Sequence, residues 1–335
     1  MSTAPVAADQ IGLAPTREAA ALIARFESVP FSRWHIRARI IVGSATFFDA
    51  FDALSMAYVL PVLAHLWALS QQQAGLLIGA SYVGQVIGAL VFSRLAQTCA
   101  RRHGVADAPS APPLVMASEP EHSRWRELLS PEFRRRSLIV WSLWACAFLI
   151  TNSLNNWAPT LYHTVYGMGL RPALRAASLN NIAQVMVLLV CAILIDRIGR
   201  RTWTTWAFAA GGVSLAVLGL IGADNATPVV VLTTMSYGII GSANAVLYLY
   251  TPEIYPTRMR AIGVGLATLW LRAASATGPM LVGLILADGS VRLLFLMFAG
   301  ISALGVLASL QMIETRGRRL EEIAATPQPD ATGGR

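Results

Sequence analysis

The stretch LLFLMFAGISALGVLASLQMI, from Leu293 to Ile313, decides the fold class, because its 21 residues include no charged side chain. About 20 consecutive apolar residues form a helix long enough to cross the hydrocarbon core of a bilayer. Seven further stretches are of similar length and are predominantly apolar. They lie at 40–62, 74–96, 137–161, 174–195, 203–223, 228–250 and 261–286. The sequence therefore predicts an all-α, polytopic membrane protein with about eight transmembrane helices.

The composition of the whole chain supports this prediction. Of the 335 residues, 55% are hydrophobic and 13% are charged, and the mean hydropathy is +0.54. Soluble domains carry about 25% charged residues. So little charge excludes soluble enzymes, coiled coils and disordered chains, and the continuous apolar runs argue against a transmembrane β-barrel.

Arginine provides all 26 cationic side chains, and its distribution predicts the topology. With the N-terminus inside, 22 arginines fall in cytoplasmic segments, whereas Arg171, Arg175 and Arg292 fall in outside loops and Arg272 falls within a helix. This excess of cytoplasmic arginine is typical of multi-pass membrane proteins. We expect a protein of the bacterial inner membrane with both termini cytoplasmic. The net charge of +8 then reflects topology rather than nucleic-acid binding.

The apolar stretches are unevenly distributed along the chain. A cytoplasmic segment, 1–39, precedes two predicted helices within 40–96. A proline-containing cytoplasmic linker, 97–136, follows and is expected to close with a short interfacial amphipathic helix. Six predicted helices occupy 137–313, and a cytoplasmic tail occupies 314–335. The organisation is therefore two helices followed by six.

A charged turn follows the fourth predicted helix, with the sequence IDRIGRR. Gly199 permits the tight turn, and Arg197, Arg200 and Arg201 can anchor at lipid headgroups. Asp196 can cap or pair with a neighbouring helix end, so this turn can make and break charge contacts as helix bundles rock. The alternative is plain membrane anchoring.

Two further charged blocks follow the sixth and eighth predicted helices. The first is PEIYPTRMR, in which Glu253 can form an ion pair with Arg258 or Arg260. The second, ETRGRRLEEI, begins at Glu314.

In this order and at these helix ends, the three blocks resemble the turn and tail motifs of the major facilitator superfamily. The resemblance is to its metabolite:proton symporters, the group around sugar porters and aromatic-acid or nicotinate transporters. It implies that 137–313 forms a complete six-helix C-terminal half. It also implies that 40–96 is a two-helix remnant of the N-terminal half, so that the fold has about eight helices instead of twelve and lacks the family's helices three to six.

Two acidic residues lie in the first predicted helix, in a segment similar to the first helix of the aromatic-acid symporters. Asp49 and Asp52 are three residues apart and therefore share a helix face. A buried carboxyl favours its neutral form and can gain and lose a proton. We predict that this pair is the proton-coupling site. The alternatives are a hydrogen bond in helix packing or a position near the aqueous end.

Arg272 lies about midway along the seventh predicted helix. Its guanidinium can bind a carboxylate through two hydrogen bonds. The resemblance supports a substrate-binding role, because the aromatic-acid symporters carry an arginine in their eleventh helix. The alternative is that Arg272 is a partner for Asp49 or Asp52.

Four amide side chains complete the predicted substrate site. Asn152, Asn155 and Asn156 lie in the third predicted helix, and Gln184 lies in the fourth. Amides suit a polar cavity for an organic ligand, although hydrogen bonds between helices are an equal alternative.

These residues lead to one functional prediction. The chain is expected to be a secondary active transporter that couples protons to a small organic acid or sugar-like metabolite by alternating access, and not an enzyme. Its expected partners are that substrate, protons and the lipid bilayer, and a second copy of the chain is a further candidate. No cofactor and no metal are expected. The alternative is a truncated, transport-inactive remnant or a membrane interaction module.

Overall fold

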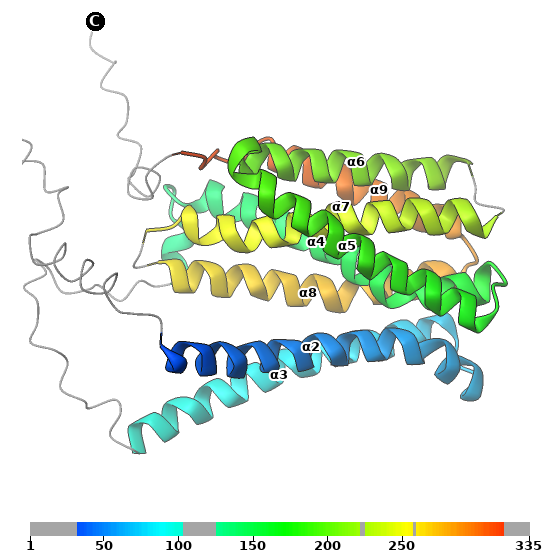
Figure 1. The fold of residues 1–335 in the computed structure, drawn as a ribbon, viewed down its shortest axis with the longest axis horizontal. Helices are drawn as coiled ribbons and strands as arrows, with labels where there is room; N and C mark the ends of the chain where they lie inside the picture. Colours follow the sequence, from blue (N-terminus) through cyan, green and yellow to red (C-terminus); the bar gives the residue numbers. More distant parts are fainter. Residues whose placement is uncertain (1–31, 103–124, 222–224, 257–258, 318–335) are drawn as a thin grey trace, which may run out of the picture. The chain divides into compact units, whose positions relative to one another are not determined.

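The computed structural model describes residues 32–102, 125–221, 225–256 and 259–317 (Figure 1). Its described residues form helices and turns without a strand, which confirms the all-α prediction. The chain divides into two units, 1–52 and 53–335, with the boundary inside a helix. The described part of the first unit is helical from Arg33 onward, and everything below concerns the second unit unless stated.

The long helices overlap the eight predicted apolar stretches. They are α2 (Arg33–Leu66), α3 (Gln71–Arg102), α4 (Arg134–Thr160), α5 (Leu170–Ile198), α6 (Arg200–Ile221), α7 (Ala226–Glu253), α8 (Arg260–Ala287) and α9 (Val291–Ser309). Within the described residues, the six helices from α4 to α9 are long and apolar enough to cross a membrane, whereas the apolar part of α2, Leu54–Leu66, is shorter. The chain is therefore a multi-pass membrane protein.

Two short elements flank α4. The five-residue 3-10 helix η3 (Trp125–Leu129) lies where the short amphipathic helix is predicted, with Leu128 buried and Trp125 exposed. The π-helical turn η4 (Leu161–Val165) continues α4 after Pro159. The segment 103–124, which contains most of the predicted linker, lies outside the described residues.

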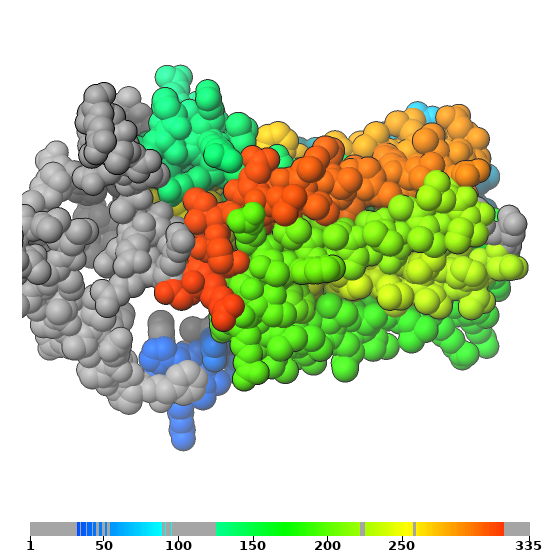
Figure 2. Space-filling view, turned by 90° about the horizontal axis from the view of Figure 1, so that it is seen from above, coloured from blue at the N-terminus to red at the C-terminus, as the bar shows by residue number. Residues whose placement is uncertain are grey.

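Helix α4 is the central element of the six-helix unit, since it packs against α5, α7, α8 and α9. Its large aromatic side chains, Trp144 and Trp157, are almost fully buried. Helices α6 and α9 lie side by side along their length and form a continuous surface (Figures 1 and 2). Close packing of this kind holds helices together in a bilayer, where lipid removes most of the hydrophobic drive for association.

Helices α3 and α8 cross closely where Gly75 of α3 meets Gly283 of α8. A Cβ added to Gly75 would lie 2.7 Å from the carbonyl oxygen of Pro279, and one added to Gly283 would lie 3.2 Å from the Cα of Gly75. The G-x-x-x-G pair Gly75 and Gly79 therefore allows close contact between helices α3 and α8. The second pair in α3, Gly84 and Gly88, has nothing within 4 Å of its Cβ positions among the described residues.

The outer surfaces of the helices are apolar. On α5, for example, Ile182, Val185, Met186, Leu189 and Ile193 are all more than half exposed. Such a large exposed apolar surface is unfavourable in water but fits the hydrocarbon core of a bilayer. This pattern supports the prediction that lipid surrounds the helices.

Candidate functional site

A hydrogen-bonded group of polar side chains joins α4, α5 and α7 inside the unit. The hydroxyl of Tyr237 donates to Oδ1 of Asn155 at 3.4 Å and to Oδ1 of Asn181 at 3.2 Å. Tyr237 is buried, with 6% of its surface exposed. One hydroxyl proton cannot fully satisfy two carbonyl oxygens, so one amide oxygen retains the capacity to accept a further donor.

Gln184 lies beside this group. It follows Asn181 by three residues on α5, and the two side chains therefore share a helix face. A Cβ added to Gly241 of α7 would lie only 2.5 Å from Nε2 of Gln184, so the glycine makes room for this amide. Gly241 follows Tyr237 by one helical turn, so the Gln184 amide packs against α7 one turn beyond Tyr237.

The other two predicted amides face different helices. Asn156 donates from Nδ2 to the hydroxyl of Tyr82 on α3 at 3.1 Å and to the backbone oxygen of Asn152 at 2.8 Å. Asn152 donates from Nδ2 to Oγ of Ser275 on α8 at 2.5 Å. These bonds connect α4 to α3 and α8, as the helix-packing alternative predicts, and Asn156 is buried.

Arg272 is half-buried on α8, and its Nη1 donates to Oε1 of Gln85 on α3. Gln85 is neutral, and no carboxylate with a described side chain pairs with the guanidinium. Ser275 follows Arg272 by three residues and shares its helix face. Asn152 on α4 thus contacts the face of α8 that carries Arg272, and Asn155 on α4 contacts Tyr237 of α7.

The structure places Asp49 and Asp52 in α2, within the first unit. Their side chains lie outside the described residues. Their predicted role, and the alternative that they pair with Arg272, therefore remain predictions.

Sequence reasoning missed Asn181, Gln85 and Tyr82 and did not include Tyr237 in the predicted site. The signal for Asn181 was its spacing of three residues from Gln184. Gln85 and Tyr82 are polar side chains within an apolar helix and share a face with each other. The pairing of Gln85 with Arg272 depends on the crossing of α3 and α8, which the sequence does not determine.

The three charged blocks meet at one end of the six-helix unit. Arg200, the first residue of α6, pairs through Nη1 with Oδ1 of Asp196 at 2.9 Å and through Nη2 with Oε1 of Glu253 at 3.4 Å. The Asp196 side chain is 77% exposed, whereas that of Glu253 is 16% exposed. Arg200 thus joins the α5–α6 turn to the end of α7, while Arg197 and Arg201 are exposed.

The segment after α9 completes this cluster. The carboxylate of Glu314 accepts hydrogen bonds from the backbone N–H groups of Arg200 at 3.0 Å and Arg201 at 3.2 Å. Thr315 donates from Oγ1 to Oε2 of Glu253 at 2.6 Å. The red end of the coloured chain lies against the start of α6 in Figure 2. We call Asp196, Arg200, Glu253, Glu314 and Thr315 the charged cluster.

Of the two expected partners of Glu253, Arg260 does not pair with it among the described residues: Glu253 pairs with Arg200, and Nε of Arg260 donates to the backbone oxygen of Tyr255 at 3.2 Å. Arg258 lies outside the described residues. Tyr255 is buried in the α7–α8 turn and donates to Oγ of Ser137 at 2.9 Å, and burial raises the pKa of its hydroxyl.

The described helices thus form an apolar multi-helix bundle of a membrane protein, with amide side chains and an arginine between them. The sequence profile of the sugar (and other) transporter family matches residues 113–326, and the chain belongs to that family of major facilitator superfamily transporters, which are not enzymes.

Curated relatives agree with this assignment. The chain is 28% identical over 229 residues to the synaptic vesicle 2-related protein of Xenopus laevis, covering 62% of this chain and 41% of the relative. It is 25% identical over 306 residues to the rat (Rattus norvegicus) protein of the same name, covering 81% and 54%. It is 30% identical over 203 residues to the niacin transporter NiaP of Acinetobacter baylyi, covering 59% and 45%. The chain spans about half the length of these relatives.

Proposed function

We propose that this chain transports a small organic acid across the membrane together with protons. The observation that carries the proposal is the environment of Arg272, whose guanidinium meets neutral Gln85 and no carboxylate with a described side chain. A charged side chain at the centre of a bilayer costs at least about 2.5–3.5 kcal/mol on insertion scales. An anionic substrate offsets this cost when it binds.

The chemistry of the site favours a carboxylate as the substrate group. The planar guanidinium matches a carboxylate with two parallel hydrogen bonds. One relative carries the name niacin transporter, and niacin is an aromatic carboxylic acid. Asn155 and Gln184, together with Asn181 and Tyr237, then provide hydrogen bonds for the rest of the ligand. Because other relatives are named metabolite transport proteins, a sugar-like metabolite is the second substrate class.

Proton coupling is assigned to Asp49 and Asp52. Both lie within α2, and three-residue spacing places them on one helix face. Protonation removes the negative charge that makes a carboxylate costly in a bilayer, so binding and release of a proton can accompany movement of the helix.

Alternating access supplies the mechanism. In this proposal two bundles rock around a central site, and the charged cluster holds one end of the six-helix unit closed until its ion pairs separate. The arginine distribution supports a cytoplasmic position for the cluster and for both termini, in a bacterial inner membrane.

A specific observation also favours the second candidate function. The described residues contain two long helices before α4, whereas the proposed domain organisation requires six in a complete N-terminal half. Alternating access requires two bundles that face one site, and two helices form only a small bundle opposite a six-helix unit. A transport-inactive remnant or a membrane interaction module is therefore the alternative, and a second copy of the chain is one source of the missing bundle.

Uptake by the full-length protein in proteoliposomes tests these proposals. With an alkaline interior, we expect accumulation of labelled nicotinate or benzoate, which a protonophore abolishes. Arg272→Gln is expected to abolish uptake. Arg175→Gln is the matched control, because Arg175 is an exposed arginine of α5 outside the polar interior. Sugar uptake without acid uptake overturns the carboxylate assignment, and no uptake of any solute favours the remnant.

A further inference from the structure

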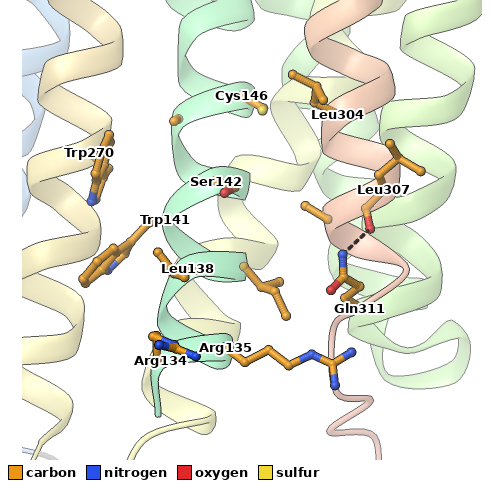
Figure 3. Close-up of a pocket in the computed structure, with 13 residues that line it drawn as sticks. Arg134, Arg135, Leu138, Trp141, Ser142, Cys146, Trp270, Leu304, Leu307 and Gln311 are labelled. Carbon is orange, nitrogen blue, oxygen red and sulfur yellow. Dashed lines mark hydrogen bonds between the residues drawn. The ribbon is translucent and has the colours of Figure 1, made fainter. Parts of the chain in front are cut away.

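A groove runs along the outer surface of the six-helix unit between α4, α8 and α9. It encloses about 780 Å³ and lies away from the polar interior described above. Its floor and walls are mainly apolar, with Leu138 and Cys146 on α4, Trp270 on α8, and Leu304 and Leu307 on α9 (Figure 3).

Two arginines mark one end of this groove. Arg134 and Arg135 are exposed at the start of α4, and neither forms an ion pair with a described residue. Figure 3 shows Arg135 extending from α4 toward the end of α9, where Gln311 lies. The mouth of the groove therefore presents two guanidinium groups that form no ion pair with a described residue.

The length of the groove matches one leaflet of a bilayer. The part of α4 from Arg134 to Cys146 rises about 18 Å. Half of a hydrocarbon core is about 15 Å thick. With the arginines at the headgroup level, the apolar walls extend to about the middle of the membrane.

Two tryptophans form an aromatic part of the groove wall. The indole of Trp141 stacks against that of Trp270 with ring centroids 6.2 Å apart, and both line the groove. Indole side chains are enriched at the level of the lipid headgroups.

We propose that this groove binds an anionic glycerophospholipid. The phosphate contacts Arg134 and Arg135, and one acyl chain lies along Leu138, Leu304 and Leu307. Basic pockets between helices at a membrane surface favour anionic headgroups in this way. The inference goes beyond the proposed transport function, and its test uses binding rather than uptake.

Native mass spectrometry of the full-length protein, after delipidation in detergent, measures this binding directly. Phosphatidylglycerol and phosphatidylcholine with identical acyl chains are added separately at matched concentrations. We expect phosphatidylglycerol to bind as one preferred copy per chain. Arg134→Gln combined with Arg135→Gln is expected to weaken that binding roughly tenfold or more, to the level of phosphatidylcholine.

Two variants separate the groove from general surface charge. Arg37→Gln combined with Arg39→Gln removes the same charge from exposed positions of α2 outside the groove and should leave the preference intact. Ser142→Trp retains both arginines but fills the groove, so it should also abolish the preferred copy. Circular dichroism and thermal unfolding verify that each variant is folded.

Several results overturn the proposal. Equal binding of the two lipids, equal losses in the α2 and α4 arginine variants, or unchanged binding in Ser142→Trp each do so. Competition by millimolar inorganic phosphate in place of lipid identifies a phosphate site without an acyl-chain component. A two-chain species that disappears with Ser142→Trp identifies the groove as a contact between copies.

Discussion

The carboxylate of Glu314 caps the N-terminus of the helix that begins at Arg200. Its two oxygens accept from the backbone N–H groups of Arg200 and Arg201, although 114 residues separate Glu314 from Arg200 along the chain. A negative charge at this position also interacts favourably with the helix dipole. The segment after α9 is therefore an integral part of the α5–α6 turn.

Removal of this cap should destabilise the protein. Glu314→Ala is expected to cost about 1–2 kcal/mol, because two backbone donors lose their acceptor and the helix dipole loses its counter-charge. Thermal unfolding of the purified protein in detergent should show a lower midpoint. Asp288→Ala, an exposed acidic position after α8, is the control and should leave the midpoint nearly unchanged.

Gly199 should tolerate substitution less well than other glycines. Its φ is +98°, and an added Cβ would lie 2.5 Å from Oε2 of Glu314, so Gly199→Ala both strains the backbone and displaces the cap. We expect a loss of about 1–3 kcal/mol. Gly300→Ala is the matched change, since nothing lies within 4 Å of the Cβ position there. Comparable unfolding midpoints for the two variants would show that Gly199 has no special role.

The Tyr237 group should matter for transport more than for stability. Tyr237→Phe retains the aromatic ring but removes the hydroxyl that bridges Asn155 and Asn181. If these groups bind substrate, the KM for acid uptake should rise at least tenfold. The unfolding midpoint should fall only modestly, since a hydrogen bond contributes about 1 kcal/mol. An unchanged KM would contradict the binding assignment.

Tyr255 should make stability depend on pH in the alkaline range. Burial raises the pKa of its hydroxyl above the value in the unfolded chain, which is about 10. The native state therefore favours the protonated phenol, and its contribution is complete below pH 10 and lost as the pH rises further. Unfolding midpoints between pH 8 and 11 should fall more steeply for the wild type than for Tyr255→Phe. Parallel curves would show that Tyr255 does not titrate on unfolding.

The sequence predicted local features well. Apolar length located the helices, because a bilayer imposes a fixed span on each one. The need for a tight turn between two predicted helices located Gly199. The G-x-x-x-G spacing alone does not show which pairs are in contact: Gly75 and Gly79 lie against α8, whereas Gly84 and Gly88 have nothing within 4 Å of their Cβ positions among the described residues.

Long-range pairs were the part that could not be predicted. The sequence indicated that Glu253 forms an ion pair, but the nearest arginines along the chain were the expected partners. The partner is Arg200, which reaches Glu253 because α6 packs beside α7. The partner of Arg272 could not be predicted either, because its contact with Gln85 depends on how α3 crosses α8, which local sequence patterns do not encode.

The Tyr237 hydroxyl has one proton and two acceptors of similar distance on different helices. Rotation of that proton exchanges one hydrogen bond for the other without creating a new unpaired donor. Helices α4 and α5 can therefore shift slightly against α7 while the hydroxyl keeps one acceptor in reach. This exchangeable hydrogen bond permits relative motion of the neighbouring helices at a small energetic cost.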